Sequence, residues 1–312
     1  MPEKKAPRNK TIDTPVSEGA AYLSRCVRID RQVDGIDSVT DKTVIGDMRR
    51  ICPLLPKESV DLIIADPPYN LTKIYNGSRF GKKKAADYEE YTREWLSVIC
   101  PLLRPEGSVY VCCDWETNLI TGRVLGDFFR IRSRITWQRE KGRGAGANWK
   151  NGLEDIWFAT KTDRYTFNLD AVKMRRRVIA PYRVDGKPKD WISTDKGSFR
   201  DTCPSNFWDD ITIPFWSMPE NTAHPAQKPE KLIPGSCLPA RIPGILCLIP
   251  SLGQALPALW QKSSGVITWG SSGRSSTASG RSSALKWRKR LRVSRDMRTG
   301  CSGKETACIK TF

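Results

Sequence analysis

The stretch DLIIADPPYN, from Asp61 to Asn70, places four apolar residues directly before an acid, two prolines and a tyrosine. Leu62 to Ala65 predict a short, fully buried strand of the kind found inside a parallel sheet. Asp66 would then lie at the carboxyl end of that strand, where open α/β sheets bind their ligands. The two prolines stiffen the turn and remove two backbone donors. The stretch therefore predicts a rigid site with a carboxylate at its rim and an aromatic face, Tyr69, beside it.

The segments around this stretch alternate between strand and helix patterns. A helix is expected over Met48–Leu54, and a second one carries apolar residues on one face from Tyr88 to Leu102 until RPEG, residues 104–107, ends it. This alternation predicts a doubly wound α/β sheet. The expected strands are Thr43–Ile45, Val60–Ala65, 108–113, 132–138 and 155–160.

The composition of the 312 residues, with 39% hydrophobic and 28% charged residues, is that of an ordinary soluble protein. No apolar run is long enough for a membrane span, and the polar start at Met1 has no signal-peptide core, so a cytoplasmic protein is expected. The ten cysteines form no C-x-x-C pair and His224 is the single histidine. Reduced thiols and no metal site are therefore expected.

The net charge of +18 suggests a polyanionic partner, but the charge is unevenly distributed. Residues 232–312 contain 13 lysines and arginines against 2 acids, a net of +11, whereas the remaining chain carries 39 − 32 = +7. The main body is moderately basic and the tail strongly so.

Asp66-Pro67-Pro68-Tyr69 matches the D-P-P-Y motif of the DNA amino-methyltransferases, which methylate adenine N6 or cytosine N4 with S-adenosylmethionine. The resemblance continues through LLRPEGSVYVC, ITWQRE, NWKNGLEDIWFATKTDRYTFN and HPAQKPEKL, and it covers roughly Thr43 to Leu232. It implies a Rossmann-like methyltransferase sheet in the permuted order, in which D-P-P-Y comes first and the glycine loop for the cofactor comes last.

The chemistry of the motif fits this resemblance. The Asp66 carboxylate and the Pro67 carbonyl could accept the two hydrogens of an exocyclic amine and direct its lone pair toward the methyl donor. The base must leave the duplex to reach them, and Tyr69 offers it a stacking face. The alternative is a strand that ends in a proline turn, with Asp66 as a helix cap.

Three further residues are candidates for the cofactor site, each with a structural alternative. Asp47 follows a short strand and either reaches the cofactor or caps the helix that begins at Met48. The resemblance places the segment His224–Pro229 against the cofactor, so Gln227 and Lys228 are candidates there. They could equally start a surface helix.

Two basic segments are candidates for DNA contact. The lysine-rich loop after the catalytic motif could meet phosphates or simply be solvated. Lys173–Trp191 occupies the position of the family's target-recognition region and could read guanine or hold phosphate. The residues singled out are Lys82, Lys83, Lys84, Arg175, Arg176, Arg177 and Arg183.

The tail lacks the glycine loop D-P-F-x-G-S-G-T that the family carries after K-P-E-K-L. If the gene is read one nucleotide upstream, a permitted choice of synonymous codons turns Ile242–Val266 into NPGDIVLDPFLGSGTTCIVAKKLGR. That sequence contains the missing loop, so a frameshift just after Lys231 is inferred. The basic charge of the tail then says nothing about partners, and the sheet of this chain is expected to be incomplete at its C-terminus.

These observations predict a site-specific adenine-N6 DNA methyltransferase of a restriction-modification system or an orphan modification enzyme, with duplex DNA and a cognate restriction endonuclease as partners. In this reading frame, weak or no activity is expected. The alternatives are a cytosine-N4 enzyme, a non-catalytic basic DNA-binding protein and a methyltransferase of protein side-chain amides. The expected organisation is a disordered arm (1–20), a catalytic domain (21–172), a target-recognition region (173–205), a cofactor-proximal segment (206–232) and an out-of-frame tail (233–312).

Overall fold

The computed structural model describes residues 6–11, 26–40, 42–75, 78–139, 146–178, 182–221, 228–229, 231–232, 247–251 and 266–270. Its main sheet has eight strands in the order β1-β15-β14-β2-β5-β7-β6-β13. Neighbouring strands are parallel, except that β7 runs antiparallel to both β5 and β6. The strands are β1 (Thr43–Ile45), β2 (Val60–Ala65), β5 (Leu103–Cys113), β6 (Arg130–Gln138), β7 (Leu153–Thr160), β13 (Phe207–Trp208), β14 (Cys247–Ser251) and β15 (Val266–Gly270).

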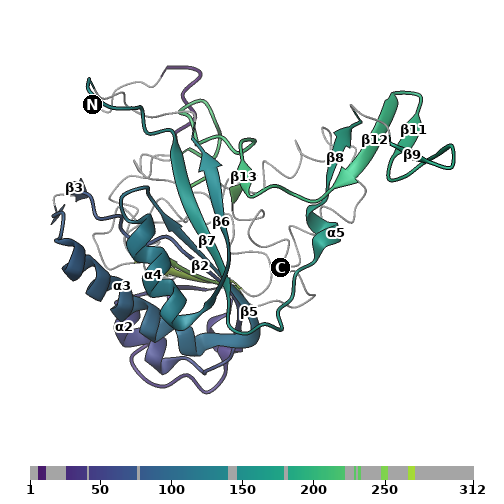
Figure 1. The fold of residues 1–312 in the computed structure, drawn as a ribbon. Helices are drawn as coiled ribbons and strands as arrows, with labels where there is room; N and C mark the ends of the chain where they lie inside the picture. The colour runs from purple at the N-terminus through teal and green to yellow at the C-terminus, as the bar shows by residue number, and fades with distance from the viewer. Residues whose placement is uncertain are drawn as a thin grey trace.

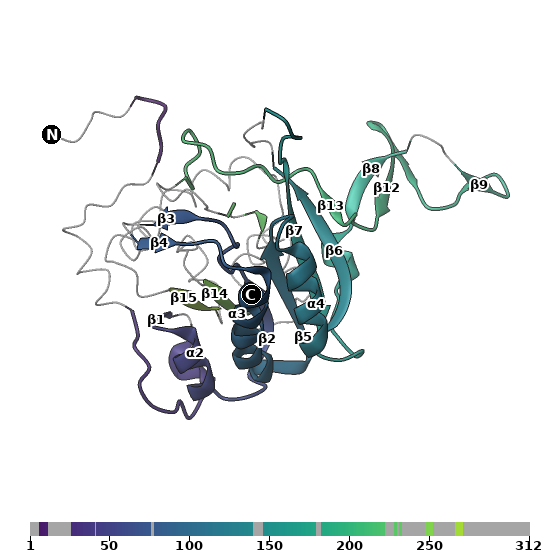
Figure 2. The same cartoon turned by 60° about the vertical axis from the view of Figure 1, so that its left-hand side comes forward.

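Three α-helices, α2 (Met48–Ile51), α3 (Ala85–Ile99) and α4 (Asn118–Phe128), lie side by side along one face of this sheet (Figures 1 and 2). Their buried residues, Trp95 and Leu96 of α3 among them, pack with Val60, Ile63 and Val109 of the central strands in one hydrophobic core. The predicted α/β sheet is therefore confirmed. No helix of the described residues is long and apolar enough to cross a membrane.

The strands expected over 132–138 and 155–160 begin two residues earlier, at Arg130 and Leu153. Two larger differences from the predicted boundaries are explained by prolines and a glycine. The helix expected over Met48–Leu54 ends as α2 at Ile51 and continues as the 3₁₀ turn η3 (Cys52–Leu54), with a proline near its start. RPEG does not separate helix from strand, because a second such turn, η4 (Cys100–Leu102), ends α3 and residues 104–107 belong to β5. A Cβ at Gly107 would lie 2.9 Å from the Asp61 carbonyl oxygen, so this strand needs a glycine there.

The order of the strands shows how the chain fills the sheet. Strands β1 and β2 are consecutive strands in the sequence but are not neighbours in the sheet. Two strands from the far end of the sequence, β15 and β14, lie between them. The inferred frameshift predicts that these central strands are missing from this chain. In the structure, tail residues form both of them. Cys247 and Leu248 of β14 pair with Leu62 and Ile63 of β2.

A smaller sheet extends away from the main one beyond α5 (Leu169–Val172), as Figures 1 and 2 show. It is built from β8 (Met174–Arg177), β12 (Gly197–Thr202) and β11 (Ile192–Thr194), beside the short hairpin β9 (Arg183–Val184) and β10 (Lys187–Pro188). Another hairpin, β3 (Lys73–Tyr75) and β4 (Ser78–Phe80), follows the D-P-P-Y segment directly.

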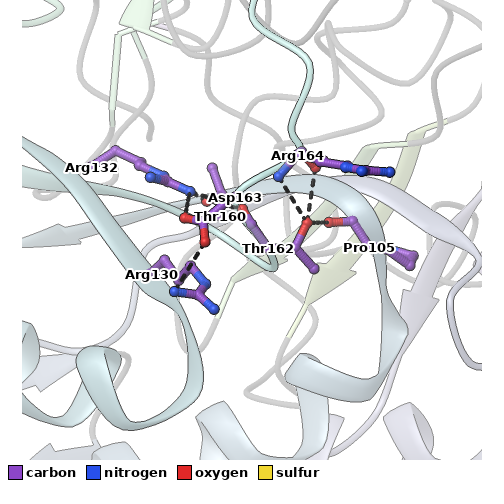
Figure 3. A network of polar contacts seen from close by, with 7 residues as sticks. All are labelled: Pro105, Arg130, Arg132, Thr160, Thr162, Asp163 and Arg164. Carbon is purple, nitrogen blue, oxygen red and sulfur yellow. Dashed lines mark hydrogen bonds and ion pairs between the residues drawn. The ribbon is translucent and has the colours of Figure 1, made fainter.

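A polar network fixes the C-terminal end of β7 and the turn that follows it (Figure 3). Arg132 of β6 donates to the Thr160 hydroxyl at 2.9 Å and to the Asp163 carboxylate at 2.8 Å. Thr162 donates to the Pro105 carbonyl of β5 at 2.8 Å. The turn after β7 is thereby tied to both neighbouring strands, which fixes the position of β7 in the sheet.

Candidate active site

Asp66 follows the last residue of β2 and is 3% exposed, at the carboxyl edge of the parallel strands. Because β7 runs antiparallel to β5, its first residues reach this same edge. Glu154, the second residue of β7, is 6% exposed and comes close to Asp66 in this way. Two buried carboxylates therefore meet at the edge where α/β sheets bind ligands.

The D-P-P-Y segment is held by hydrogen bonds from α3 and the loop before it. The Tyr88 hydroxyl donates to the Pro68 carbonyl at 3.1 Å. The Asn70 side chain donates to the Lys83 carbonyl at 2.9 Å and accepts from the Lys83 amide at 2.7 Å. These contacts fix the segment on both sides, as the rigid turn predicted from the two prolines requires.

Lys228 lies inside this site rather than on a surface helix. Its ammonium nitrogen is 3.1 Å from Oδ1 of Asp66, 3.2 Å from Oε2 of Glu154 and 4.8 Å from the centre of the Tyr69 ring. The Tyr69 hydroxyl donates to Oε2 of Glu154 at 2.9 Å. Arg139 approaches Oε1 of Glu154 at 2.6 Å. We call these five residues the buried charge cluster.

Burial and pairing set the charges in this cluster. Burial alone would raise the Glu154 pKa, but Lys228 and Arg139 lower it more, so that it lies below its usual range. Burial alone would lower the Lys228 pKa, but Asp66 and Glu154 raise it well above its usual range. Burial raises the pKa of Asp66 despite the nearby Lys228 ammonium. Burial, and then the two carboxylates, raise the Tyr69 pKa, which keeps the phenol neutral.

Of the two other predicted cofactor residues, Asp47 takes the structural alternative. It caps α2, with its Oδ1 accepting from the Arg49 amide at 3.0 Å. The hydrogen bond from the Arg49 side chain, opposed by partial burial, lowers the Asp47 pKa. Gln227 and His224 lie outside the described residues.

The predicted lysines lie between the D-P-P-Y segment and α3, and all three are exposed. Lys82 pairs with Glu116, whereas the Lys83 ammonium lies 5.9 Å from the centre of the Tyr91 ring. Lys84 is the N-cap residue of α3.

The predicted arginines lie on the smaller sheet and its hairpin. Arg175 makes two hydrogen bonds with Asp201, at 2.9 and 3.0 Å. Arg176 and Arg177 are exposed on the same strand, and Arg183 lies over the Trp191 ring at 5.5 Å. The structure groups these arginines on one projecting element, apart from the lysine-rich loop.

Sequence reasoning missed Glu154, Arg139 and Tyr88 as members of the site. Glu154 stands in the quoted segment NGLEDIWF, as an acid before an apolar strand. Asp66 was recognised from a related pattern, an acid next to an apolar strand, but there the acid follows the strand. Recognising Glu154 requires knowing that β7 runs antiparallel, and a strand pattern does not contain that information.

The fold and site define an α/β protein with a Rossmann-like sheet and a buried D-P-P-Y segment at its carboxyl edge. The DNA methylase family matches residues 60–235, more than half of the chain, so this protein belongs to the DNA methylase family. The type II methyltransferase M.HpaI of Haemophilus parainfluenzae is 30% identical over 204 residues, which span 64% of this chain and 59% of that protein. The DNA adenine methyltransferase YhdJ of Escherichia coli K12 is 31% identical over 224 residues, 68% of this chain and 71% of that protein.

The chain thus spans less than two thirds of the first of these relatives. Among solved structures, the cytosine-N4-specific PvuII DNA methyltransferase is similar over 96% of this chain and 94% of its own, with a TM-score of 0.53 and 14% identity. This likeness supports the fold.

Proposed function

We propose that this protein methylates the exocyclic N6 amine of adenine at specific sites in duplex DNA, with S-adenosylmethionine as the methyl donor. The observation that carries this proposal is Asp66, a buried carboxylate at the carboxyl edge of the sheet, beside the Tyr69 ring. Aspartate at the first motif position favours adenine, because the resemblance associates cytosine-N4 enzymes more often with serine. The adenine methyltransferase YhdJ among the relatives supports this choice.

The protein's own residues would act by accepting hydrogen bonds. An exocyclic amine is a poor nucleophile because its lone pair is delocalised into the ring of the base. The Asp66 carboxylate and the Pro67 carbonyl would each accept one amine hydrogen and draw the nitrogen toward tetrahedral geometry. The bound cofactor supplies the methyl group. Proximity and orientation then provide most of the rate, without a covalent enzyme intermediate.

The target base would have to leave the duplex to reach Asp66. Tyr69 offers a face for stacking, and the Tyr69–Glu154 hydrogen bond at 2.9 Å fixes the orientation of its ring. Because Tyr88 and Asn70 hold the neighbouring backbone, the D-P-P-Y segment would be in position before the base arrives.

In this reading frame, the residues that follow β14 do not match the glycine loop that the family uses for the cofactor. In the pairing of β14 with β2, Leu248 lies beside Ile63, and continuing this register brings Ser251 beside Asp66. The following residues, from Leu252 to Ala255, contain a single glycine. In the restored frame, D-P-F replaces residues 249–251 and L-G-S-G follows. This coincidence with the edge of the sheet supports the inferred frameshift, and with it a cofactor loop next to the catalytic acid.

Three further assignments belong to this proposal. The arginines of the smaller sheet would contact DNA on one side of the flipped base, and Lys82, Lys83 and Lys84 would contact it near the catalytic segment. A restriction endonuclease that recognises the same sequence would be the partner. The protein would act in the cytoplasm, bound to the nucleoid.

A methyl-transfer assay tests the proposal. Purified chains of this frame and of the restored frame are incubated with methyl-labelled S-adenosylmethionine and unmethylated genomic DNA, and the digested nucleosides are separated. We expect N6-methyladenine from the restored frame and little or none from this frame. Asp66→Ala should abolish transfer, whereas Asp61→Ala, on the same strand but paired with Arg104, should retain it. Methylation by the Asp66→Ala chain would contradict the mechanism, and N4-methylcytosine would contradict the choice of base.

A non-catalytic DNA-binding function is the second candidate, favoured by the exposed arginines of β8. It predicts DNA binding with a steep salt dependence and no methyl transfer in either frame.

A further inference from the structure

Lys228 is enclosed between two carboxylates from different strands. Its side chain is 5% exposed, that of Asp66 4% and that of Glu154 7%. The ammonium lies at nearly equal distances from the two, 3.1 and 3.2 Å. A buried ammonium is tolerated only when it is paired in this way, because removal from water costs several kcal/mol per ion.

The buried charge cluster contains as many cations as anions. Lys228 and Arg139 balance Asp66 and Glu154, and Arg139 lies 2.6 Å from the Glu154 oxygen that does not contact Lys228. Glu154 is thus contacted by two cations, whereas Lys228 is the cation of this cluster that contacts Asp66. Asp66 therefore depends more strongly on Lys228 than Glu154 does.

The remaining titratable groups facing Lys228 stay neutral near pH 7. Tyr69 has a pKa raised by burial and by the two carboxylates. Burial likewise raises the pKa of Cys112, which lies on β5 between β2 and β7. Neither of these two groups therefore supplies a charge that could replace that of Lys228.

Removing Lys228 would leave two buried carboxylates near one another with one cation. In such pairs one carboxylate takes up a proton, because two like charges cannot both remain ionised at short range in a dry site. Arg139 would keep Glu154 ionised, so the proton would go to Asp66. A protonated Asp66 carries a donor where the target amine needs an acceptor.

We propose that Lys228 is a positioning residue for methyl transfer, whose ammonium, held in place by Glu154, keeps Asp66 as an oriented, ionised acceptor for the target amine. This inference rests on the proposed function. It gives Lys228 a role different from the cofactor contact predicted for it, and it gives Glu154 a role that its place in the sequence does not indicate.

The first test measures thermal unfolding of the full chain, in this frame, between pH 4.5 and pH 8. In Lys228→Met the Asp66 carboxylate, which has lost its cation, destabilises the folded state only where it is ionised. The loss of Tm relative to the wild type should therefore be small at pH 4.5 and grow as pH rises. The control is Lys231→Met, three residues after Lys228, which removes an exposed ion pair with Asp210. Its loss of Tm should be small and should not change with pH.

A double variant makes the test independent of packing. Lys228→Met with Asp66→Asn retains one anion, Glu154, and the cation that contacts it, Arg139, so its Tm should lose the additional pH dependence of the single variant. A loss of Tm in Lys228→Met that is constant with pH, or a double variant that keeps the pH dependence, would overturn the charge-balancing role.

The second test uses the restored frame, in which activity is expected. Lys228→Met should move the acidic limb of the pH–rate profile to higher pH, because Asp66 then needs a higher pH to ionise, and Lys228→Arg should move it back. An unchanged limb would overturn the positioning role. If the wild-type restored chain transfers no methyl group, the proposed function fails, and the positioning role for transfer fails with it. The thermal data would still show independently whether the cluster is charge-balanced.

Discussion

Asp47 illustrates how one carboxylate can serve either a helix or a ligand. Its bond to the Arg49 amide and its place before α2 are those of a helix cap. We expect Asp47→Ala to lower the free energy of unfolding by about 1 kcal/mol and Asp47→Asn to lower it less, because asparagine also caps helices. Since the folded pKa is lowered, this contribution is present above the unfolded pKa and is lost as pH falls through the folded value. Urea unfolding at pH 7 and pH 3 checks both statements.

A contact between Asp47 and the cofactor would give a different result in the restored frame. Both variants would then weaken the binding of S-adenosylmethionine, whatever their effect on the helix. Equal binding by Asp47→Asn and the wild type would leave the cap as the single role of this side chain.

The residues of the candidate site differ in how far the sequence reveals their positions. Asp66 was predictable because four apolar residues precede it directly and two prolines follow. The contacts of Lys228 were not predictable, because its partners lie more than seventy positions away and meet it only after the sheet has formed. Asp47 lay between these cases, since a cap and a ligand use the same residue types after a strand.

At the scale of elements, the packing of α4 on β7 depends on Gly122. A Cβ at this position would lie 2.5 Å from Cζ2 of Trp157, whose indole also donates to the Asn118 carbonyl at 3.2 Å. Gly126, one turn later, is the matched control, because its Cβ would meet Ile131 at 3.7 Å, an ordinary contact.

Gly122→Ala should therefore lower the free energy of unfolding by roughly 1–3 kcal/mol through overpacking. Gly126→Ala should leave it unchanged or raise it by up to about 1 kcal/mol, since alanine is the better helix former. Chemical denaturation of both variants measures the contrast. Equal effects would mean that α4 shifts on the sheet without cost.

Two neighbouring arginines of the smaller sheet, Arg175 and Arg176, differ in their orientation and in their partners. Side chains of Arg175 and Arg176 point to opposite faces of β8, and Arg175 is already bound to Asp201 while Arg176 lies opposite Arg200. We expect Arg176→Ala to weaken binding to duplex DNA of any sequence and to reduce the slope of log affinity against log salt by about 1. Arg175→Ala should change the slope less.

Fluorescence anisotropy of a labelled duplex over a range of salt concentrations measures both slopes. A larger effect of Arg175→Ala, or no effect of Arg176→Ala, would place the DNA on the other face of β8. A loss of affinity confined to one sequence would instead mean that Arg176 reads a base.

Element boundaries were predictable where pattern and tertiary packing agree. Val60–Ala65 and Thr43–Ile45 match the predicted strands, because the apolar run of β2 and Val44 of β1 are buried in the sheet. RPEG was misassigned, since proline and glycine usually interrupt regular structure. Here the glycine is required by the close approach of β5 to the Asp61 carbonyl, a contact between segments forty-six positions apart.

At the scale of the whole molecule, the order of segments along the chain differs from their order in the sheet. Strand β2, which directly precedes Asp66, comes early in the sequence, whereas its neighbour β14 comes from the tail. The carboxyl ends of these two parallel strands lie at one edge, so a cofactor loop after β14 would meet Asp66 without any rearrangement. The reading frame of the tail therefore decides whether the two halves of one site meet.

This dependence predicts a difference in cofactor binding between the two frames. With S-adenosylmethionine at one hundred times its dissociation constant, a binding-competent chain should gain about 2.7 kcal/mol of stability and a corresponding rise in Tm. We expect this rise for the restored frame and none for this frame. Asp66→Ala in the restored frame should retain most of the rise, because Asp66 acts on the base rather than on the cofactor. A rise of equal size in both frames would mean that this chain holds the cofactor without the glycine loop, and the inferred frameshift would then have no functional consequence at this site.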